Sequence, residues 1–594
     1  MGFRIDSYFI FEKMKDFVKT IVAVICAFVI MGILRGIFFL IMLGSMALSG
    51  SSTSAVPKTG GVLDLNLSSF TLGEQSQSDP APSLNSMSFE TIPTVGIRDA
   101  VTALQEAAVD PAIKFVFLRP DGALGGMSQL EELRKALSAF RESGKPVLAY
   151  TEIPSNGSYY LASVADKVLM GNAHGGTYTL LGLSSQSFFL KDLLDKLGVN
   201  VQLIRHGKFK SAGEMFIRNT SSSENREQNQ VMISSLWKAM ASAAAASRDM
   251  SEEQFNDIID KLVLVTPEDF VSNGLVDELV DYAGLQNKMK TLAQVEDYKK
   301  VHLVSLPSYI DAKVSAKPSK NKVAVLYADG EIVDGSGKSQ VAGDRFMKLV
   351  EKLRKDKNVK AVVLRVNSPG GSVSASVKIR TALDSLMKEK PLVASFGDYA
   401  ASGGYWISSG CQKIYADATT VTGSIGVFSL IPDFSKVTKK VGVNVESVGS
   451  NKHSDMMSLM RPFDAAELAY MQASVEDIYE LFVNLVATSR GLSVERVDQI
   501  AQGRVWAAAD ALEVGLVDEI GTLQDAISYA AALADLPSSD DYSVASYPAV
   551  PSFFEQLMSQ LGGSGMGEDV RLRVLKSYEP GRFYARLPYD YEIR

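Results

Sequence analysis

The chain carries much of its sequence pattern twice. Residues 360–371 repeat the order of apolar and charged positions in residues 114–125, and Gly-Leu-Val-Asp-Glu occurs at 274–278 and again at 515–519. The two copies lie roughly 240 residues apart, and self-similarity at a long, constant spacing is typical of duplicated structural units. The sequence therefore predicts a tandem of two similar domains, and differences between the copies carry information about function.

The two copies have lost different reactive groups. The alignment places Ser402, in an Ala-Ser-Gly-Gly setting, opposite Gly157, although a shift of one position would offer Ser158. In the other direction, it places Lys210 opposite Ser454. The second copy thus keeps a hydroxyl without an amine, and the first keeps an amine without the hydroxyl. These complementary losses predict one composite Ser/Lys site per chain.

The composition is that of a globular protein with more than one domain. A chain of 594 residues exceeds what one hydrophobic core usually organises, and 46% hydrophobic with 22% charged residues is ordinary. The net charge of −8 leaves no basic surface of the kind that nucleic acid requires, so we exclude nucleic-acid binding. With only two cysteines, Cys26 and Cys411, a disulfide framework is not expected.

The N-terminal region predicts a membrane anchor. Residues 21–48 are almost wholly apolar, interrupted by Arg35, and about 20 such residues cross the hydrocarbon core as a helix. Lys13, Lys15 and Lys19 precede this run, so the positive-inside rule places the first residues in the cytoplasm and the rest of the chain outside. A cleavable signal peptide is the alternative, but its apolar part would be only about 7–15 residues long. We therefore expect one uncleaved transmembrane helix.

The remainder alternates between short β-branched runs and helical stretches. Runs such as 323–326 and 361–364 alternate with stretches such as 374–388 and 465–489, and this alternation predicts an α/β fold with mostly parallel sheets. The predicted organisation is a cytoplasmic N-terminus with the anchor (1–48), a flexible tether (49–59), a first domain (60–311), a linker (312–321), a second domain (322–540) and a C-terminal tail (541–594).

Four motifs together resemble one known family. They are Phe-Lys-Ser-Ala at 209–212, Asn-Ser-Pro-Gly-Gly at 367–371, the segment 397–406 around Ser402, and Thr-Gly-Ser-Ile-Gly at 422–426. Over roughly residues 60–535 the chain resembles the bacterial signal peptide peptidase SppA family of the long, tandem-domain type, also called protease IV. The resemblance implies a crotonase-like (ClpP-like) α/β fold for each domain of the tandem, following the one N-terminal transmembrane helix.

The same resemblance implies roles for three residues. Ser402 takes the position of the nucleophile, Lys210 that of the general base, and Ser424 that of a hydroxyl beside the lysine. Phe209 stands where the family has a tyrosine, which bears on the local shape of the pocket.

The chemistry explains why these residue types are needed. A serine hydroxyl is a weak nucleophile until a base removes its proton, and a lysine can do so only when it is neutral. Its pKa must therefore fall from about 10.4, which burial in a dry cleft can achieve. The oxyanion needs backbone N–H donors aimed at one point, and we expect them from Gly370 and Gly371, and from Gly403 or Gly404 after the nucleophile.

Several simpler interpretations compete with this site. Ser402 could merely cap a helix. Lys208 is the better candidate for a solvated surface lysine, and Lys452, near Ser454, leaves the alignment open by a residue or two. His206 and His453 fall in corresponding regions of the two copies and could serve a Ser/His/Asp triad, although neither lies in a triad motif.

Other motifs do not lead to a cofactor. Residues 335–339 (Gly-Ser-Gly-Lys-Ser) resemble the end of a phosphate-binding loop, but Ile332 occupies the position of the first required glycine. No Cys/His/Asp cluster has metal-ligand spacing. We expect neither a metal nor an organic cofactor.

The sequence and the resemblance together predict a membrane-anchored serine endopeptidase that degrades unstructured, apolar peptides. The resemblance further implies remnant signal peptides as substrates, the periplasmic side of the bacterial inner membrane as location, and a closed or bowl-shaped homo-oligomer, with a tetramer expected. A crotonase-type acyl-CoA enzyme and a non-catalytic, peptide-binding membrane scaffold are the alternatives. The tail is rich in aromatic residues between 583 and 592 and could be a subunit contact or a lid.

Overall fold

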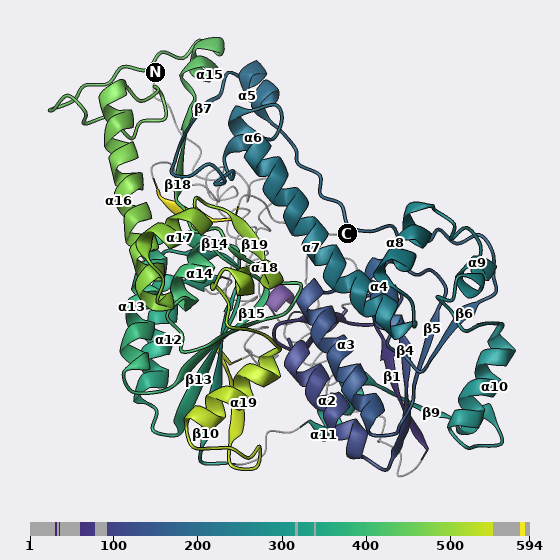
Figure 1. Cartoon of the computed structure of the whole chain (residues 1–594). Helices are drawn as coiled ribbons and strands as arrows, with labels where there is room; N and C mark the ends of the chain where they lie inside the picture. Colours follow the sequence, from purple (N-terminus) through teal and green to yellow (C-terminus); the bar gives the residue numbers. More distant parts are fainter. Residues whose placement is uncertain are drawn as a thin grey trace, which may run out of the picture. The chain divides into compact units, whose positions relative to one another are not determined.

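The first repeat is built around a parallel sheet (Figure 1). Its strands are β1 (Gly61–Asn66), β4 (Ile113–Arg119), β5 (Val147–Thr151), β6 (Lys167–Gly171), β8 (Glu278–Val280) and β9 (His302–Ser305), and a separate pair is formed by β2 (Thr71–Gly73) and β3 (Thr94–Gly96). The six strands follow the order β8-β6-β5-β4-β1-β9, and each neighbouring pair is parallel. The helices are α2 (Ile97–Val109), α3 (Met127–Glu142), α4 (Asn156–Ala162), α5 (Lys191–Leu197), α6 (Glu214–Ile217), α7 (Ser223–Ser247), α8 (Glu252–Asp260), α9 (Pro267–Ser272), α10 (Tyr282–Leu292), η1 (Tyr298–Lys300) and α11 (Leu306–Lys313).

The second repeat has a sheet of the same kind. Its strands are β10 (Lys322–Asp329), β13 (Val359–Ser368), β15 (Leu392–Ala401), β16 (Ile414–Ala416), β17 (Val421–Gly423), β19 (Val505–Ala507), β20 (Glu519–Ile520) and β21 (Ser543–Tyr547). The main order is β19-β17-β15-β13-β10-β21, with only the β17–β19 pair of this sheet antiparallel. The helices are α12 (Gly343–Lys355), α13 (Val373–Met387), α14 (Gly403–Ser408), α15 (Ser435–Lys440), α16 (Ala465–Arg490), α17 (Val494–Ile500), α18 (Ala508–Glu513) and α19 (Leu523–Leu533).

A third sheet joins the two repeats. It contains β7 (Asn200–Arg205), β11 (Ile332–Val333), β12 (Val341–Ala342), β14 (Gly370–Ser372), β18 (Phe428–Asp433) and β22 (Tyr584–Arg586). The order is β12-β11-β14-β22-β18-β7. Strand β7 belongs to the first repeat and pairs along its whole length with β18 of the second, while β22 comes from the C-terminal tail. The loops that follow these strands are therefore held together in space.

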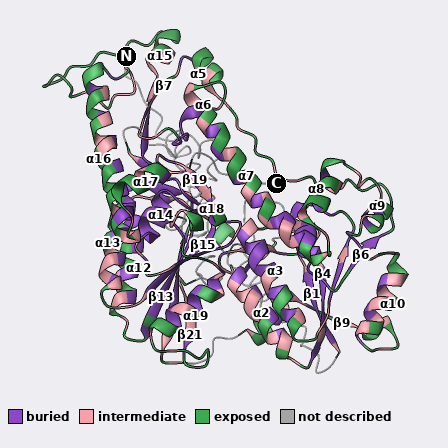
Figure 2. Ribbon diagram, in the orientation of Figure 1, coloured by how far each residue is buried: buried purple, intermediate pink, exposed green. Residues whose placement is uncertain are grey.

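The apolar runs form strands because both of their faces are buried. In β10, Val323 and Val325 pack toward α19, while Ala324 and Leu326 pack into the larger core on the opposite face. A parallel strand covered on both sides reads as a continuous apolar run. Figure 2 shows the strands of the large sheets as buried and the outer helix faces as exposed. The predicted α/β architecture with mostly parallel sheets is confirmed.

The computed structural model describes residues 30–32, 35, 60–77, 92–314, 319–337, 340–549 and 582–587. Pro57–Arg594 form one compact unit and Met1–Val56 another. Most of the apolar run at 21–48 lies outside the described residues, and among the described ones no helix has the length and apolarity to cross a bilayer. The transmembrane helix and the domain boundaries stay predictions.

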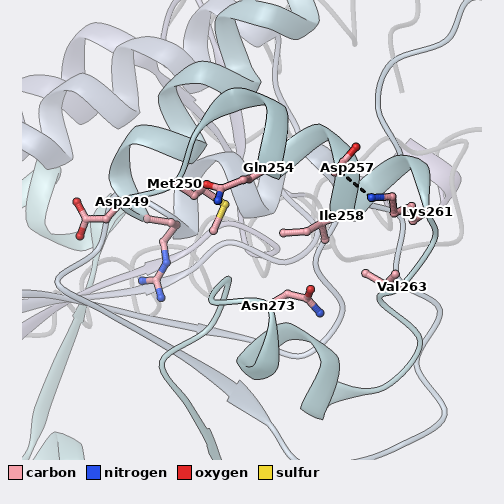
Figure 3. Close-up of a pocket in the computed structure, with 9 residues that line it drawn as sticks. Asp249, Met250, Gln254, Asp257, Ile258, Lys261, Val263 and Asn273 are labelled. Atoms are coloured by element: carbon pink, nitrogen blue, oxygen red, sulfur yellow. Dashed lines mark hydrogen bonds and ion pairs between the residues drawn. The ribbon is translucent and has the colours of Figure 1, made fainter.

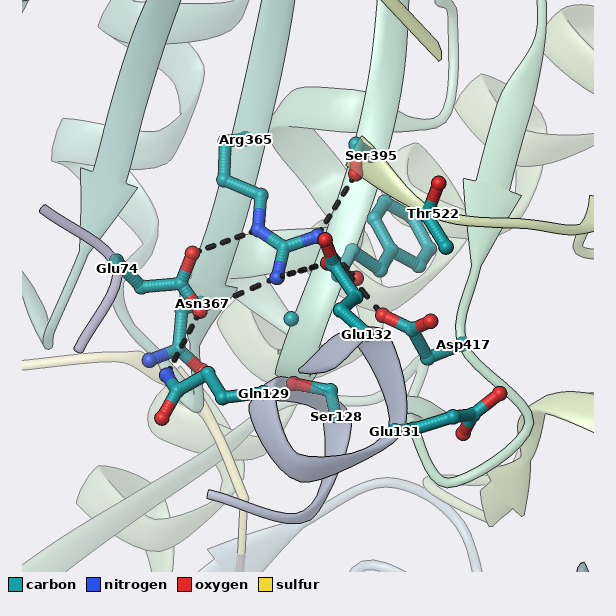
Figure 4. A network of polar contacts seen from close by, with 12 residues as sticks. Glu74, Ser128, Gln129, Glu131, Glu132, Arg365, Asn367, Ser395, Asp417 and Thr522 are labelled. Atoms are coloured by element: carbon teal, nitrogen blue, oxygen red, sulfur yellow. Dashed lines mark hydrogen bonds and ion pairs between the residues drawn. The ribbon is translucent and has the colours of Figure 1, made fainter. Parts of the chain in front are cut away.

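A buried ionic network holds the repeats together (Figure 4). Arg365 on β13 has no solvent exposure, and its Nε lies 2.6 Å from Glu74 Oε2 of the first repeat. Its Nη2 lies 2.9 Å from Oε1 of Glu132 on α3. Burial raises the pKa of Glu132, and burial together with the Glu132 carboxylate raises the pKa of Asp417 well above its ordinary value. The guanidinium is thus the buried cation that Glu74 and Glu132 share, while Lys135 lies 3.3 Å from Asp417.

Replacing Arg365 with methionine should destabilise the protein by about 3–5 kcal/mol, because removing one partner leaves buried carboxylates without compensation. The first repeat offers a matched control in Arg119, which occupies the same position, pairs with Asp64 at 2.6 Å, and has a side chain that is 37% exposed. Arg119→Met should cost about 1 kcal/mol or less. Urea denaturation measures both variants, and equal losses would contradict a central role for Arg365.

Candidate active site

Ser402 lies in a strained turn between β15 and α14. Its φ of 56° and ψ of −112° are rare for a residue with a side chain, and such a conformation costs of order 1–3 kcal/mol. Its N–H donates to Gly423 O at 2.8 Å, and its carbonyl accepts from Trp406 N at 2.8 Å. The side chain makes no capping hydrogen bond to α14, so the simple interpretation as a helix cap is wrong. The hydroxyl is left available for other contacts.

Lys210 of the first repeat meets this hydroxyl. It follows β7, is fully buried, and places Nζ 2.9 Å from Ser402 Oγ. The same nitrogen lies 2.9 Å from Ser424 Oγ and 3.1 Å from Ser424 O. Burial lowers the pKa of Lys210 well below its ordinary value because the ammonium loses its hydration. The amine and the hydroxyl that the duplication separates by sequence are in hydrogen-bonding contact within one chain.

Ser424 occupies a second unusual turn at the end of β17. Its φ is 51°, its side chain is fully buried, and its N–H donates to Arg504 O at 2.7 Å. The hydroxyl faces the Lys210 amine. The contact predicted between the lysine and this serine is therefore present.

Gly370 and Gly371 form the glycine loop. Because glycine has no side chain, other backbone segments can approach this loop more closely than they could approach any other residue. Gly370 and Gly371 have φ values of +100° and +154°. A Cβ on Gly371 would lie 1.9 Å from Ile332 O, and one on Gly403 would lie 3.1 Å from Gly371 N. The backbones of Gly371 and Gly403 thus come close to each other beside Ser402. The Gly370 N–H donates to Ser368 Oγ at 3.2 Å, so that donor is already engaged.

A strand from the tail covers the glycine loop. Strand β22 pairs antiparallel with β14, with Ala585 opposite Gly371, and also meets β18 where Tyr584 lies opposite Phe428. Ala585 is fully buried, and a Cβ on Gly370 would lie 2.1 Å from its carbonyl oxygen. The sequence suggested a lid or a subunit contact for this tail but not a place between two strands of the site.

The residues considered as alternatives to Ser402 and Lys210 make other contacts. His206 Nδ1 contacts Glu476, and its ring stacks on Tyr479. Ser158 belongs to the capping box of α4. Lys208 is exposed, with Nζ 5.2 Å from the centre of the Phe209 ring.

One group of side chains, His453, Asp464 and Glu467, has oxygen and nitrogen atoms close enough to bind a metal. Arg461 already contacts both carboxylate oxygens of Glu467 at 2.7 Å. A guanidinium therefore neutralises the charge that a metal would need. Lys338 and Ser339 of the phosphate-loop-like motif lie outside the described residues.

A surface cleft of about 500 Å³ lies in the first repeat (Figure 3). Three of its charged side chains form ion pairs, since Arg248 contacts Asp277 at 3.0 Å and Lys261 contacts Asp257 at 2.6 Å. None of the residues that meet at Ser402 lines it. We assign no site to this cleft.

Comparison with known proteins agrees with the geometry. Residues 139–296 and 384–537 match the model of peptidase family S49. "Protease 4" of Haemophilus influenzae is 33% identical over 514 residues, covering 84% of this chain and 83% of that protein. "Protease 4" of Salmonella typhi is 36% identical over 479 residues, covering 78% and 76%. "Serine protease SPPA, chloroplastic" of Arabidopsis thaliana is 30% identical over 480 residues, covering 79% and 70%.

Among solved structures, a mutant of ClpP1 from Listeria monocytogenes aligns with 34% of this chain and 94% of its own, at 16% identity and a TM-score of 0.24. Similarity at that level decides nothing about the fold, which rests on the topology described above.

Replacing Lys210 with methionine should stabilise the protein near neutral pH, because methionine has no amine whose protonation burial disfavours. The unfolded chain binds a proton at this lysine below about pH 10.4, whereas burial disfavours that proton in the folded chain. Stability of the natural protein should therefore rise with pH toward 10.4, and the variant should lack this contribution. Urea midpoints at pH 7 and pH 9 measure the difference. Lys208→Met is the matched control, and an unchanged pH slope in Lys210→Met would contradict a buried, neutral amine.

Proposed function

The chain belongs to peptidase family S49 and is a serine peptidase, and we propose that it cleaves peptide bonds with Ser402 as nucleophile and Lys210 as general base. The observation that carries this proposal is the 2.9 Å contact between Lys210 Nζ and Ser402 Oγ at a site where both side chains are buried. Because the relatives compared are named proteases, the acyl-CoA enzyme and the non-catalytic scaffold are not retained.

The dyad accounts for both halves of the reaction. The Ser402 oxygen attacks the peptide carbonyl carbon while its proton passes to the neutral Lys210 amine. The resulting ammonium gives that proton to the leaving nitrogen, the C–N bond breaks, and an ester to Ser402 remains. Water then attacks the ester, Lys210 takes a proton from it, and the returned proton restores the Ser402 hydroxyl as the carboxylate product leaves.

Neighbouring groups orient the base and stabilise the intermediate. Ser424 contacts Lys210 Nζ through both its hydroxyl and its carbonyl, which fixes the direction of the amine toward Ser402. The N–H groups of Gly371 and Gly403 are the best candidates for the oxyanion donors. Gly370 contributes the close backbone approach, because its own N–H is engaged with Ser368.

Substrates should bind as an extended strand in the place that β22 occupies. An extended peptide can add to an exposed strand edge through main-chain hydrogen bonds, and β14 and β18 provide such edges on either side of β22. The position of Ala585 tolerates little volume, since it is fully buried against the glycine loop. This mode of binding admits unstructured peptides and rejects folded proteins.

We also propose that residues 21–48 anchor the enzyme in the bacterial inner membrane, with its catalytic domains on the periplasmic side, and that remnant signal peptides are its substrates. The apolar run, the lysines that precede it, and the resemblance to signal peptide peptidases support this proposal. We further propose a homo-oligomer, with a tetramer expected from the family resemblance. Helix α5 has no buried residue, and its Leu193 and Leu197, which are more than half exposed, could lie at a contact between subunits.

Labelling with a serine-directed phosphonate tests the dyad. Ser402→Ala should abolish covalent capture, and Lys210→Ala should slow it by about 10²–10⁴-fold because the nucleophile loses its base. Ser424→Ala should slow it roughly tenfold through the loss of one hydrogen bond to the amine. Ser158→Ala, at the neighbouring position of the first repeat, should react like the natural protein. Full labelling of Lys210→Ala would show that another base acts.

Weakening the pairing of β22 should lower the KM for an added peptide. The double variant Tyr584→Ala/Leu587→Ala removes two buried tail side chains, so β22 should leave the groove more often. The KM for a chromogenic peptide should then fall roughly fivefold or more, because the fraction of molecules with a free groove rises. Val448→Ala, an exposed position of the second repeat, serves as the control. An unchanged or higher KM would contradict binding in the place of β22.

A further inference from the structure

We propose that residues 502–504, the clamp turn, hold the general base in position against Ser402. This turn connects α17 to β19 in the second repeat, whereas the base comes from the first. The inference rests on the proposed function in taking Lys210 as the base. It assigns to Gln502, Gly503 and Arg504 a positioning role that neither the motifs nor the duplication indicated.

Each residue of the clamp turn holds a different part of the site. The carbonyl of Gln502 accepts from Phe209 N at 3.0 Å, directly before the lysine. The N–H of Gly503 donates to Ile425 O at 2.8 Å. The carbonyl of Arg504 accepts from Ser424 N at 2.7 Å. Three consecutive residues thus fix the lysine loop and the Ser424 loop relative to each other.

The contact with the lysine is a close one that requires glycine. Gly503 has a φ of +78°, and a Cβ there would lie 2.5 Å from Lys210 Cβ and 2.6 Å from Lys210 Cα. Gly426 packs from another side, where a Cβ would lie 2.9 Å from Gly503 Cα and 3.3 Å from Lys210 Cδ. The long lysine side chain therefore has little freedom to withdraw from Ser402.

A hydrogen-bond network supports the strained conformation of the turn. Gln502 has a φ of 55°, and such strain persists only where the surroundings impose it. Its Nε2 donates to Asp498 Oδ1 at 2.8 Å, and its N–H donates to the Tyr479 hydroxyl at 3.2 Å. Tyr479 in turn donates to Asp498 at 2.6 Å, and its ring stacks on His206 with centroids 3.6 Å apart. This network gives His206 a supporting role in place of the triad role considered from the sequence.

Aromatic contacts add a second hold on the lysine loop. The Arg504 guanidinium lies 4.9 Å from the centre of the Phe209 ring and 4.6 Å from that of Trp506. Cation–π contacts of this kind are attractive, and they connect the residue next to Lys210 to a strand of the second repeat.

The first repeat has a turn that corresponds to the clamp turn but has no catalytic lysine to position. After α8, the equivalent of α17, the one residue with positive φ between 261 and 266 is Leu262, which is 66% exposed, whereas after α17 both Gln502 and Gly503 have positive φ. The turn of the first repeat thus has one left-handed residue that is not glycine, as Gln502 is in the second repeat, and no counterpart of the left-handed Gly503. The glycine and its burial against Lys210 belong to the copy that completes the Ser/Lys site.

Gly503→Ala tests the clamp, with Gly442→Ala as the matched control. Gly442 has nearly the same φ, +79°, but open space where a Cβ would lie, so it reports backbone strain alone. We expect Gly503→Ala to lower kcat at least ~30-fold at pH 7. Its acid limb in the pH–rate profile should move to higher pH, because a displaced amine is less dry and harder to keep neutral. Gly442→Ala should leave both unchanged.

Tyr479→Phe keeps the test decisive if Gly503→Ala does not fold. It removes the hydroxyl that supports Gln502 and should shift the acid limb in the same direction, with a smaller loss of kcat. An unchanged kcat and acid limb in the folded variants would overturn the clamp. The proposed function would fail differently, through a Lys210→Ala protein that still reacts with phosphonate at the natural rate.

Discussion

The contact between the Lys210 amine and the Ser402 hydroxyl is the constraint on which the rest of the structure depends. An amine can accept a proton only when it is neutral, and burial lowers the pKa of Lys210, which favours the neutral form. Since the two groups come from different repeats, their 2.9 Å separation requires that the repeats behave as one rigid body at this point. The third sheet, which pairs β7 with β18, and the network around Arg365 supply that rigidity.

Comparison of the two repeats shows that the strained backbone lies in the copy that carries the nucleophile. In the first repeat, the helix that corresponds to α14 begins with Ser155, which has an ordinary extended conformation and a complete capping box. In the second repeat, the residue that precedes α14 is Ser402, which has positive φ and no capping bond. The copy without a nucleophile thus has a locally satisfied helix start, while the reactive copy keeps a conformation that only its tertiary surroundings maintain. Arg119 and Arg365 show the same contrast between a half-exposed ion pair and a buried one.

Much of this could be predicted from the sequence because it is local or duplicated. Strands such as β10 and β13 follow from unbroken β-branched runs, and Ser402 and Lys210 follow from what each copy lacks. The role of Ser424 came from the family resemblance, and that of the glycine loop from the need of an oxyanion for closely approaching backbone N–H groups. The place of β22 could not be predicted, since periodicity reports which face of a strand is buried but not which distant strand it joins. The turn around Gly503 was missed for the same reason, because a Gln-Gly pair indicates a turn but not the lysine against which it packs.

The complete burial of Ser402 and Lys210 links substrate choice to the chemistry. In this structure β22 covers the glycine loop beside Ser402, and we expect this cover to help keep water from the lysine, whose pKa is lowered by burial. A peptide that replaces β22 must therefore provide the same cover while it is being cleaved. An apolar, extended segment keeps the amine dry and neutral, whereas a strongly polar one would admit water and favour the ammonium. The apolar character that we propose for the substrates would then be a condition for the lysine base to work, in addition to any fit between side chains and the groove.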